Sequence, residues 1–194
     1  MGEGSITTTD GRRTDTRDRI RATALEIFSE RGWEGATLRE IADRLGITRP
    51  ALYYHFASKE AILDSIHDEL ARSVDEIIEW AGTQPAGAAT RASVLDRLSA
   101  LMVGQWGPFM HFAQREDDAM RALKGTAAFI KRMNALGDIL SPEDTVAGRI
   151  RARLALDALF MAGARSERLG GTPTERHDQA LLIAKQLTHS LAPR

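Results

Sequence analysis

The stretch from Thr37 to Lys59, TLREIADRLGITRPALYYHFASK, constrains the fold most, because local signals predict two helices and the turn between them. In its first half, apolar residues recur at spacings of three and four, which predicts a helix with one buried face. Thr37 and Glu40 form a capping box at its start. Gly46 follows its end, where the backbone often takes the left-handed conformation that glycine adopts easily. The chain is therefore expected to turn sharply at Gly46.

A second short helix is expected after this turn, with Thr48 as its cap and Pro50 in its first turn. Leu52 and Phe56 lie one turn apart and can anchor this helix against the first one. The other sides carry small or aromatic residues where an ordinary solvated face would carry Glu and Lys. These residues are Pro50, Ala51, Tyr53 and Tyr54. Such a surface favours contact with a partner.

Hydrogen-bond donors surround this surface. Arg49, His55 and Lys59 suit phosphate groups and the edges of DNA bases. The order of helix, glycine turn and short second helix is typical of a helix-turn-helix motif. The alternative interpretation is a pair of core helices whose tyrosines are partly buried.

Residues 37–63, TLREIADRLGITRPALYYHFASKEAIL, resemble the N-terminal signature of the TetR-type transcriptional regulators. The resemblance extends upstream through RIRATALEIFSERGWEGAT and covers residues 16–63, whereas the remainder resembles the family only in length and helical character. It implies a repressor that binds a palindromic operator in double-stranded DNA and is released by a small-molecule effector. The DNA contacts that it implies are Thr37, Arg39, Thr48, Arg49, Pro50, Ala51, Tyr53, Tyr54, His55 and Lys59. Ala51 replaces a polar residue that is frequent in relatives, which puts one base-edge hydrogen bond in doubt and favours contact with a thymine methyl group.

Composition excludes some classes of protein without indicating DNA binding. The 194 residues include no cysteine, which excludes disulfides and thiol chemistry, and carry a formal net charge of -1. Residues 11–60 hold ten Arg and Lys against eight Asp and Glu, so even this segment is only weakly basic. The chain has no apolar run long enough for a membrane span, and residues 1–14 lack the apolar core of a signal peptide, so we expect a cytoplasmic protein.

Helical periodicity continues along the chain without any strand pattern, which predicts an all-α fold of about nine helices. We expect residues 1–14 to be a disordered tail and residues 15–60 to form a three-helix DNA-binding domain. Residues 61–194 are expected to form a helical domain for ligand sensing and dimerisation. A long helix over residues 60–81 begins at the DNA-binding domain and is expected to act as a lever between the two.

The segment WGPFMHF, residues 106–112, interrupts the helical pattern. It gathers aromatic rings, a thioether and one histidine beside a Gly-Pro break, a composition suited to a cavity for a flat or apolar molecule. The candidate ligand-binding residues are Trp106, Phe109, Met110, His111, Phe129, Met133 and Phe160. The alternative is that they are packed core. No metal site is expected, because His111 and the acidic residues 116–118 lack helical metal-ligand spacing.

Two helices are expected at the C-terminal end, one starting at Ser141 and one capped by Thr172. Their apolar faces are wider than one neighbouring helix needs, so we expect them to pair with their copies in a homodimer. The alternative is that both pack wholly within one chain.

Enzyme signatures are missing from the sequence, which has no G-x-S-x-G, H-E-x-x-H or P-loop motif. We therefore expect no catalytic residues and no cofactor. Two other functions stay open: a helix-turn-helix DNA-binding protein without an effector, and a helical small-molecule carrier or enzyme.

Overall fold

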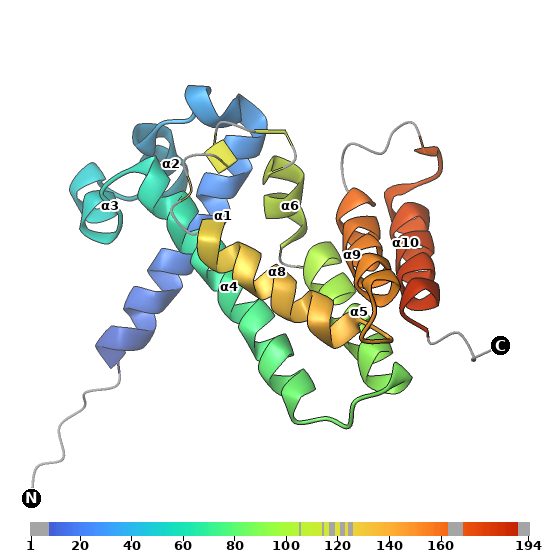
Figure 1. Cartoon of the computed structure of the whole chain (residues 1–194). Coiled ribbons are helices and arrows are strands. Elements are labelled where there is room, and N and C mark those ends of the chain that lie inside the picture. The colour runs from blue at the N-terminus through green and yellow to red at the C-terminus, as the bar shows by residue number, and fades with distance from the viewer. Residues whose placement is uncertain are drawn as a thin grey trace, which may run out of the picture. The chain divides into compact units, whose positions relative to one another are not determined.

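The computed structural model describes residues 8–104, 106–113, 115–116, 119–120, 123, 126–162 and 169–189. Every regular element in these residues is a helix (Figure 1), which confirms the predicted all-α class. The nine helices of the described residues are α1 (Thr8–Gly35), α2 (Leu38–Leu45), α3 (Arg49–His55), α4 (Lys59–Gly82), α5 (Ala88–Val103), α6 (Gly107–Ala113), α8 (Thr126–Leu140), α9 (Val146–Met161) and α10 (Pro173–Thr188).

The chain folds as two compact units, and the division between them falls inside α4. The first unit is Met1–His67 together with Glu116–Lys124, and the second is Asp68–Arg115 together with Gly125–Arg194. No helix among the described residues is both long and apolar enough to cross a membrane.

The first helix begins earlier than its apolar pattern indicates. Residues 8–14, predicted from the sequence to be part of a tail, form the first turns of α1, while residues 1–7 lie outside the described residues. Near its end α1 kinks at Gly32, where φ is 72° and ψ is 166°. Residues with a side chain rarely adopt this positive φ, so the glycine at position 32 permits the kink.

The core of the first unit consists of the apolar faces of α1 to α3 and the start of α4. Ile27 and Phe28 of α1 are fully buried, as is Ile41 of α2. Trp33 is also buried, and its ring meets that of Phe28 edge-on with 5.2 Å between the centroids. Trp33 is therefore part of the core of this unit.

In the second unit, α9 and α10 pack side by side (Figure 1). Small buried residues, Ala152 of α9 with Ala180 and Ala184 of α10, permit a close approach between two helices. α10 also contacts α5, where the buried Arg91 donates from Nε to the carbonyl of Thr188 at 2.8 Å.

The start of α9 differs from the prediction. The helix begins at Val146 instead of Ser141, because Thr145 is its cap and accepts a hydrogen bond from the backbone N–H of Gly148 at 3.0 Å. Ser141 instead donates from its hydroxyl to the carbonyl of Glu143 at 2.7 Å. The sequence Ser141-Pro142-Glu143-Asp144 therefore stabilises the turn that precedes the helix.

The start of α10 agrees with the prediction. Thr172 Oγ1 accepts from the backbone N–H of Glu175 at 3.2 Å, and Glu175 Oε2 accepts from the backbone N–H of Thr172 at 2.7 Å. This reciprocal pair is the capping box expected at Thr172.

Candidate nucleic-acid interface and ligand cavities

Two caps and a glycine orient α3. Thr37 Oγ1 accepts from the backbone N–H of Glu40 at 3.2 Å at the start of α2. Gly46 ends α2 with φ of 66° and ψ of 28°, the left-handed conformation predicted for it. Thr48 Oγ1 then accepts from the backbone N–H of Ala51 at 3.3 Å and starts α3. The turn is thus specified by residues close together in the sequence.

One face of α3 is anchored in the core. Leu52 is fully buried and Phe56, which caps the helix, is nearly so. The Arg17 guanidinium lies 4.4 Å from the centroid of the Phe56 ring, and its Nη1 donates to the carbonyl of His55 at 3.2 Å. Sequence reasoning missed this role of Arg17, because its partners lie far along the chain and follow no local pattern.

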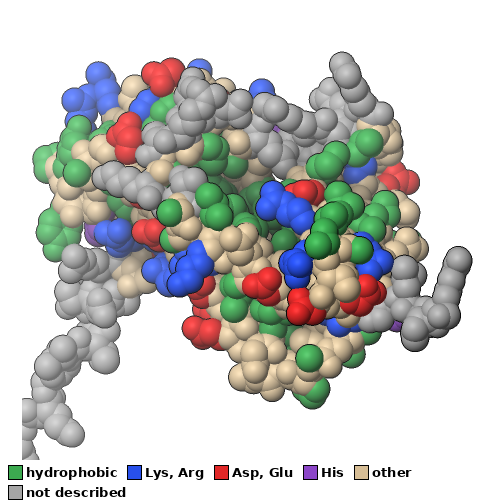
Figure 2. Space-filling model, in the orientation of Figure 1, with side chains coloured by type: hydrophobic (Ala, Val, Ile, Leu, Met, Phe, Trp, Pro, Cys, Tyr) green, Lys and Arg blue, Asp and Glu red, His purple; other side chains and the backbone are tan. Residues whose placement is uncertain are grey.

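The other sides of α3 face solvent. Tyr53 is 55% exposed and Tyr54 is 70% exposed, which is unusual for large aromatic side chains. Figure 2 shows hydrophobic side chains at the surface over α3. His55 is half-buried, and its ring meets Tyr54 edge-on with 5.3 Å between centroids. The remaining exposed predicted contacts of this helix are Arg49, Pro50 and Ala51.

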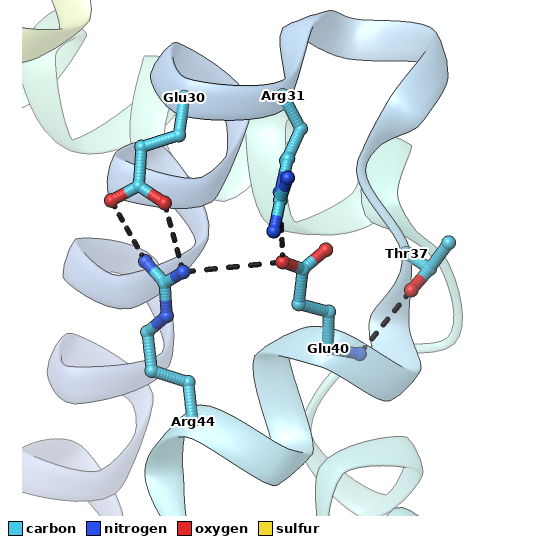
Figure 3. Close-up of polar contacts among 5 residues, drawn as sticks. All are labelled: Glu30, Arg31, Thr37, Glu40 and Arg44. Atoms are coloured by element: carbon cyan, nitrogen blue, oxygen red, sulfur yellow. Dashed lines mark hydrogen bonds and ion pairs between the residues drawn. The ribbon is translucent and has the colours of Figure 1, made fainter.

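Ion pairs hold α2 against α1 and engage several arginines of the first unit. Figure 3 shows the Arg44 guanidinium between two carboxylates: it binds Glu30 through two hydrogen bonds of 3.0 and 2.8 Å, and its Nη2 lies 3.9 Å from Glu40. Arg31 binds Glu40 at 3.1 Å from the other side. The Arg44 hydrogen bonds lower the pKa of Glu30, so the pair stays charged at neutral pH. The guanidinium groups of Arg31 and Arg44 therefore form ion pairs within the first unit.

The basic residues predicted to contact DNA differ in their surroundings. Arg49 is exposed and forms no ion pair within the described part of the chain. Arg39 is exposed beside Asp43, with 3.6 Å between Nε and Oδ2. Lys59 is half-buried: its Nζ donates to the carbonyl of Trp33 at 2.7 Å and lies 4.6 Å from the Trp33 ring centroid. Lys59 therefore joins the start of α4 to the core of its unit.

The second unit contains two cavities near the residues predicted to bind a ligand. The inner cavity measures about 20 Å³ and is lined by five of those residues, Trp106, Met110, Phe129, Met133 and Phe160. The outer cavity measures about 460 Å³ and has His111 in its wall. Phe109 is buried and lines neither of these cavities.

Sequence comparison identifies the N-terminal part of the chain. The sequence profile of "Bacterial regulatory proteins, tetR family" matches residues 20–66. Tetracycline repressor protein class C of Escherichia coli is 44% identical over 54 residues, 28% of this chain and 25% of that protein. The class D repressor of Escherichia coli is 34% identical over 103 residues, 53% of this chain and 47% of that protein. The chain thus spans at most about half the length of these curated relatives.

Structural comparison extends the likeness to the C-terminal helices. The transcriptional regulator FadR of Bacillus subtilis, solved in complex with stearoyl-CoA, superimposes with a TM-score of 0.64 over 86% of this chain and 96% of that one. At 16% identity, this likeness concerns the fold alone. Residues 20–66 thus carry the sequence signature of the tetR family of bacterial regulatory proteins, and the helical fold of the chain resembles that of FadR.

Proposed function

We propose that this chain is a cytoplasmic transcriptional regulator that binds a palindromic operator in double-stranded DNA as a homodimer. The observation that carries the proposal is the exposed surface of α3, where two tyrosines stand in solvent on a helix whose other face is anchored by Leu52. A helix of this kind fits the major groove, where base edges are distinguishable.

The proposed contacts divide into base readout and phosphate binding. Tyr53, Tyr54 and Arg49 lie on the exposed sides of α3 and can reach base edges or methyl groups, and Ala51 fits beside a thymine methyl. Thr37 and Thr48 accept backbone N–H groups through Oγ1, which leaves each hydroxyl proton free for a phosphate oxygen. The complete set is Thr37, Arg39, Thr48, Arg49, Pro50, Ala51, Tyr53, Tyr54, His55 and Lys59.

Dimerisation through α9 and α10 is supported by a solvent-exposed apolar face. Val146, Ile150 and Leu154 succeed one another at one-turn spacing on α9, and each is about half exposed or more. Figure 2 shows hydrophobic side chains at the surface over α9, with charged side chains among them. Leu182 and Ile183 of α10 are also about half exposed. Pairing with a second copy would bury this face and provide two recognition helices for two half-sites.

Release by a small molecule is the second part of the proposal. Five of the seven predicted ligand residues line the inner cavity, whose wall also includes Leu70 and Val74 of α4. The same helix begins at Lys59, which is bonded to the carbonyl of Trp33 in the DNA-binding unit. A ligand that widens the cavity would displace α4 and so change the spacing of the recognition helices, provided that it binds the two states with different affinities.

A regulator without an effector is the second candidate, because the inner cavity of about 20 Å³ is too small for a drug-sized molecule. The two candidates differ in one measurable property. The effector-responsive regulator has a ligand that lowers its operator affinity, whereas the effector-free regulator has none.

Selection of bound fragments from the organism's own genome tests DNA binding directly. We expect a shared palindromic sequence among the recovered fragments. Tyr54→Ala and Arg49→Ala should each lower affinity by about 1–3 kcal/mol, or roughly 5- to 150-fold, if they contact bases. Arg72→Ala, which removes an exposed arginine from α4, is the matched control. Fragments without any common sequence, or equal binding by all three variants, would reject the proposal.

A further inference from the structure

Two cavities of the second unit share the wall residues Met102, Met110 and Phe160. The lining of the inner cavity is apolar. The outer cavity is larger and carries the polar side chains His111, Thr174, Arg176, His177 and Asp178. A molecule that occupies both spaces needs an apolar part and a polar part.

Trp106 lines the inner cavity and is only 6% exposed. Its indole ring therefore reports on any molecule that enters this cavity.

The three methionines of the inner wall allow the space to grow. Met102, Met110 and Met133 are unbranched and flexible, so they can change rotamer around an entering apolar group. Rotamer changes of these side chains can therefore enlarge the inner cavity beyond its present volume of about 20 Å³.

Arg176 contributes an unpaired positive charge to the outer cavity. Its Nη1 donates to the carbonyls of Gly170 and Gly171 at 3.3 and 2.7 Å, which fixes the guanidinium. No carboxylate pairs with it among the described residues, and its buried Nε has no acceptor. The Nε and Nη2 edge of an arginine matches the two oxygens of a carboxylate or phosphate.

His177 does not supply a second positive charge. Its Nε2 lies 2.5 Å from Ser99 Oγ, and burial lowers the pKa of the ring below its ordinary value of 6.5. The ring is therefore neutral at pH 7. Asp178 is the one acidic side chain in the described wall of the outer cavity, and it is exposed.

We propose that the effector of this chain is an amphipathic anion. Its apolar body lies in the widened inner cavity, while its carboxylate or phosphate binds Arg176 in the outer cavity. The inference rests on the proposed effector response and adds the chemical class of the ligand.

Three probes with a ten-carbon chain test the proposal on the whole chain. They are N-decanoylglycine, its uncharged methyl ester and decyl phosphate, titrated by calorimetry. We expect N-decanoylglycine, decyl phosphate or both to bind about tenfold or more tightly than the ester, because a charge-assisted bidentate contact is lost in the ester. Whichever anion binds more tightly identifies the head group.

Two variants separate the contributions of the head group and the body. Arg176→Gln should remove the preference for the anionic probes and leave ester binding unchanged, with Arg72→Gln as the charge-matched control. Arg176→Lys keeps the positive charge but lacks the two parallel N–H donors of the guanidinium, so its preference for the anionic probes should be intermediate. Thermal unfolding of each variant verifies that it is folded.

The indole N–H signals of Trp33, Trp80 and Trp106 in a ¹⁵N-labelled sample report where a probe binds, with Trp106→Phe assigning the third. We expect only the Trp106 signal to shift strongly as the more tightly bound anion saturates the protein, because Trp106 lines the inner cavity. Equal affinity for all three probes, no binding of any probe, or an unmoved Trp106 signal at saturation would overturn the inference. If genomic fragments bind the protein but no probe does, this inference is wrong and the proposed function stands. If the probes bind as expected but no fragment is recovered, the proposed function is wrong and the ligand class stands.

Discussion

The exposed face of α9 allows the proposed dimer to be tested with one small truncation. Ile150 lies one helical turn from Val146 and from Leu154, and all three are exposed in the single protomer. Replacing Ile150 by alanine removes apolar surface without weakening the helix, because alanine has the highest helix propensity. We expect Ile150→Ala to weaken the dimer and leave the protomer folded.

The size of the effect follows from the exposed fraction. Each buried methylene contributes about 0.8 kcal/mol, so an Ile→Ala change removes about 2.4 kcal/mol where the side chain is fully covered. Ile150 is 54% exposed in the protomer, and only this exposed part can be buried by dimerisation. The substitution therefore removes about 1.3 kcal/mol of the dimerisation free energy per protomer. An isologous interface contains the residue twice, giving about 2.6 kcal/mol. The dimer Kd should therefore rise about 70-fold.

Sedimentation velocity over a concentration series measures this Kd. Ile130→Ala is the matched control, because Ile130 of α8 is also an isoleucine that is 54% exposed on a helix. We expect the control to dimerise as the wild type does. Equal Kd values for the Ile150 and Ile130 variants would refute the assignment of the interface to α9.

Three further predictions concern stability and DNA binding. A Cβ at Gly148 would lie 2.3 Å from the Glu143 carbonyl oxygen, so Gly148→Ala should destabilise the fold by about 1–3 kcal/mol, whereas Gly137→Ala, with open space around it, should not lower the thermal midpoint. The hydrogen bonds from Thr172 lower the pKa of Glu175 below 4.5, so its contribution to stability is present above pH 4.5 and is lost as the pH falls through the lowered value; Glu175→Gln should reduce the slope of thermal midpoint against pH in that range. Arg17→Met should weaken operator binding with little effect on secondary structure by circular dichroism, because it loosens the C-terminal end of α3; unchanged affinity would contradict this role.

The first unit was predictable in detail because its signals are local. The caps Thr37 and Thr48 and the turn at Gly46 depend on residues only a few positions apart, so the sequence alone identifies them. The ion pairs of Arg44 with Glu30, and the contact of Arg17 with Phe56, join residues from different helices. No periodic pattern indicates such pairs.

The ligand region was predictable only in outline. The composition around Trp106 indicated a possible cavity, and the structure places it beside Phe129 and Met133 from another helix. The roles of Arg176 and the outer cavity were not foreseen, because they depend on how the start of α10 packs near α6. Similarly, Ser141 resembled a helix cap, but the later Thr145 has the geometry to cap α9.

The central claim is that the chain binds a palindromic operator as a homodimer. The number of protomers on a selected genomic fragment, measured together with its footprint, tests this claim most directly. The account predicts two protomers per fragment, with two protected half-sites whose centres lie one helical turn apart, about 34 Å, or a multiple of it. Tyr54→Ala should weaken both protected regions together. One bound protomer on a site without two-fold symmetry, or an unchanged footprint for Tyr54→Ala, would contradict it.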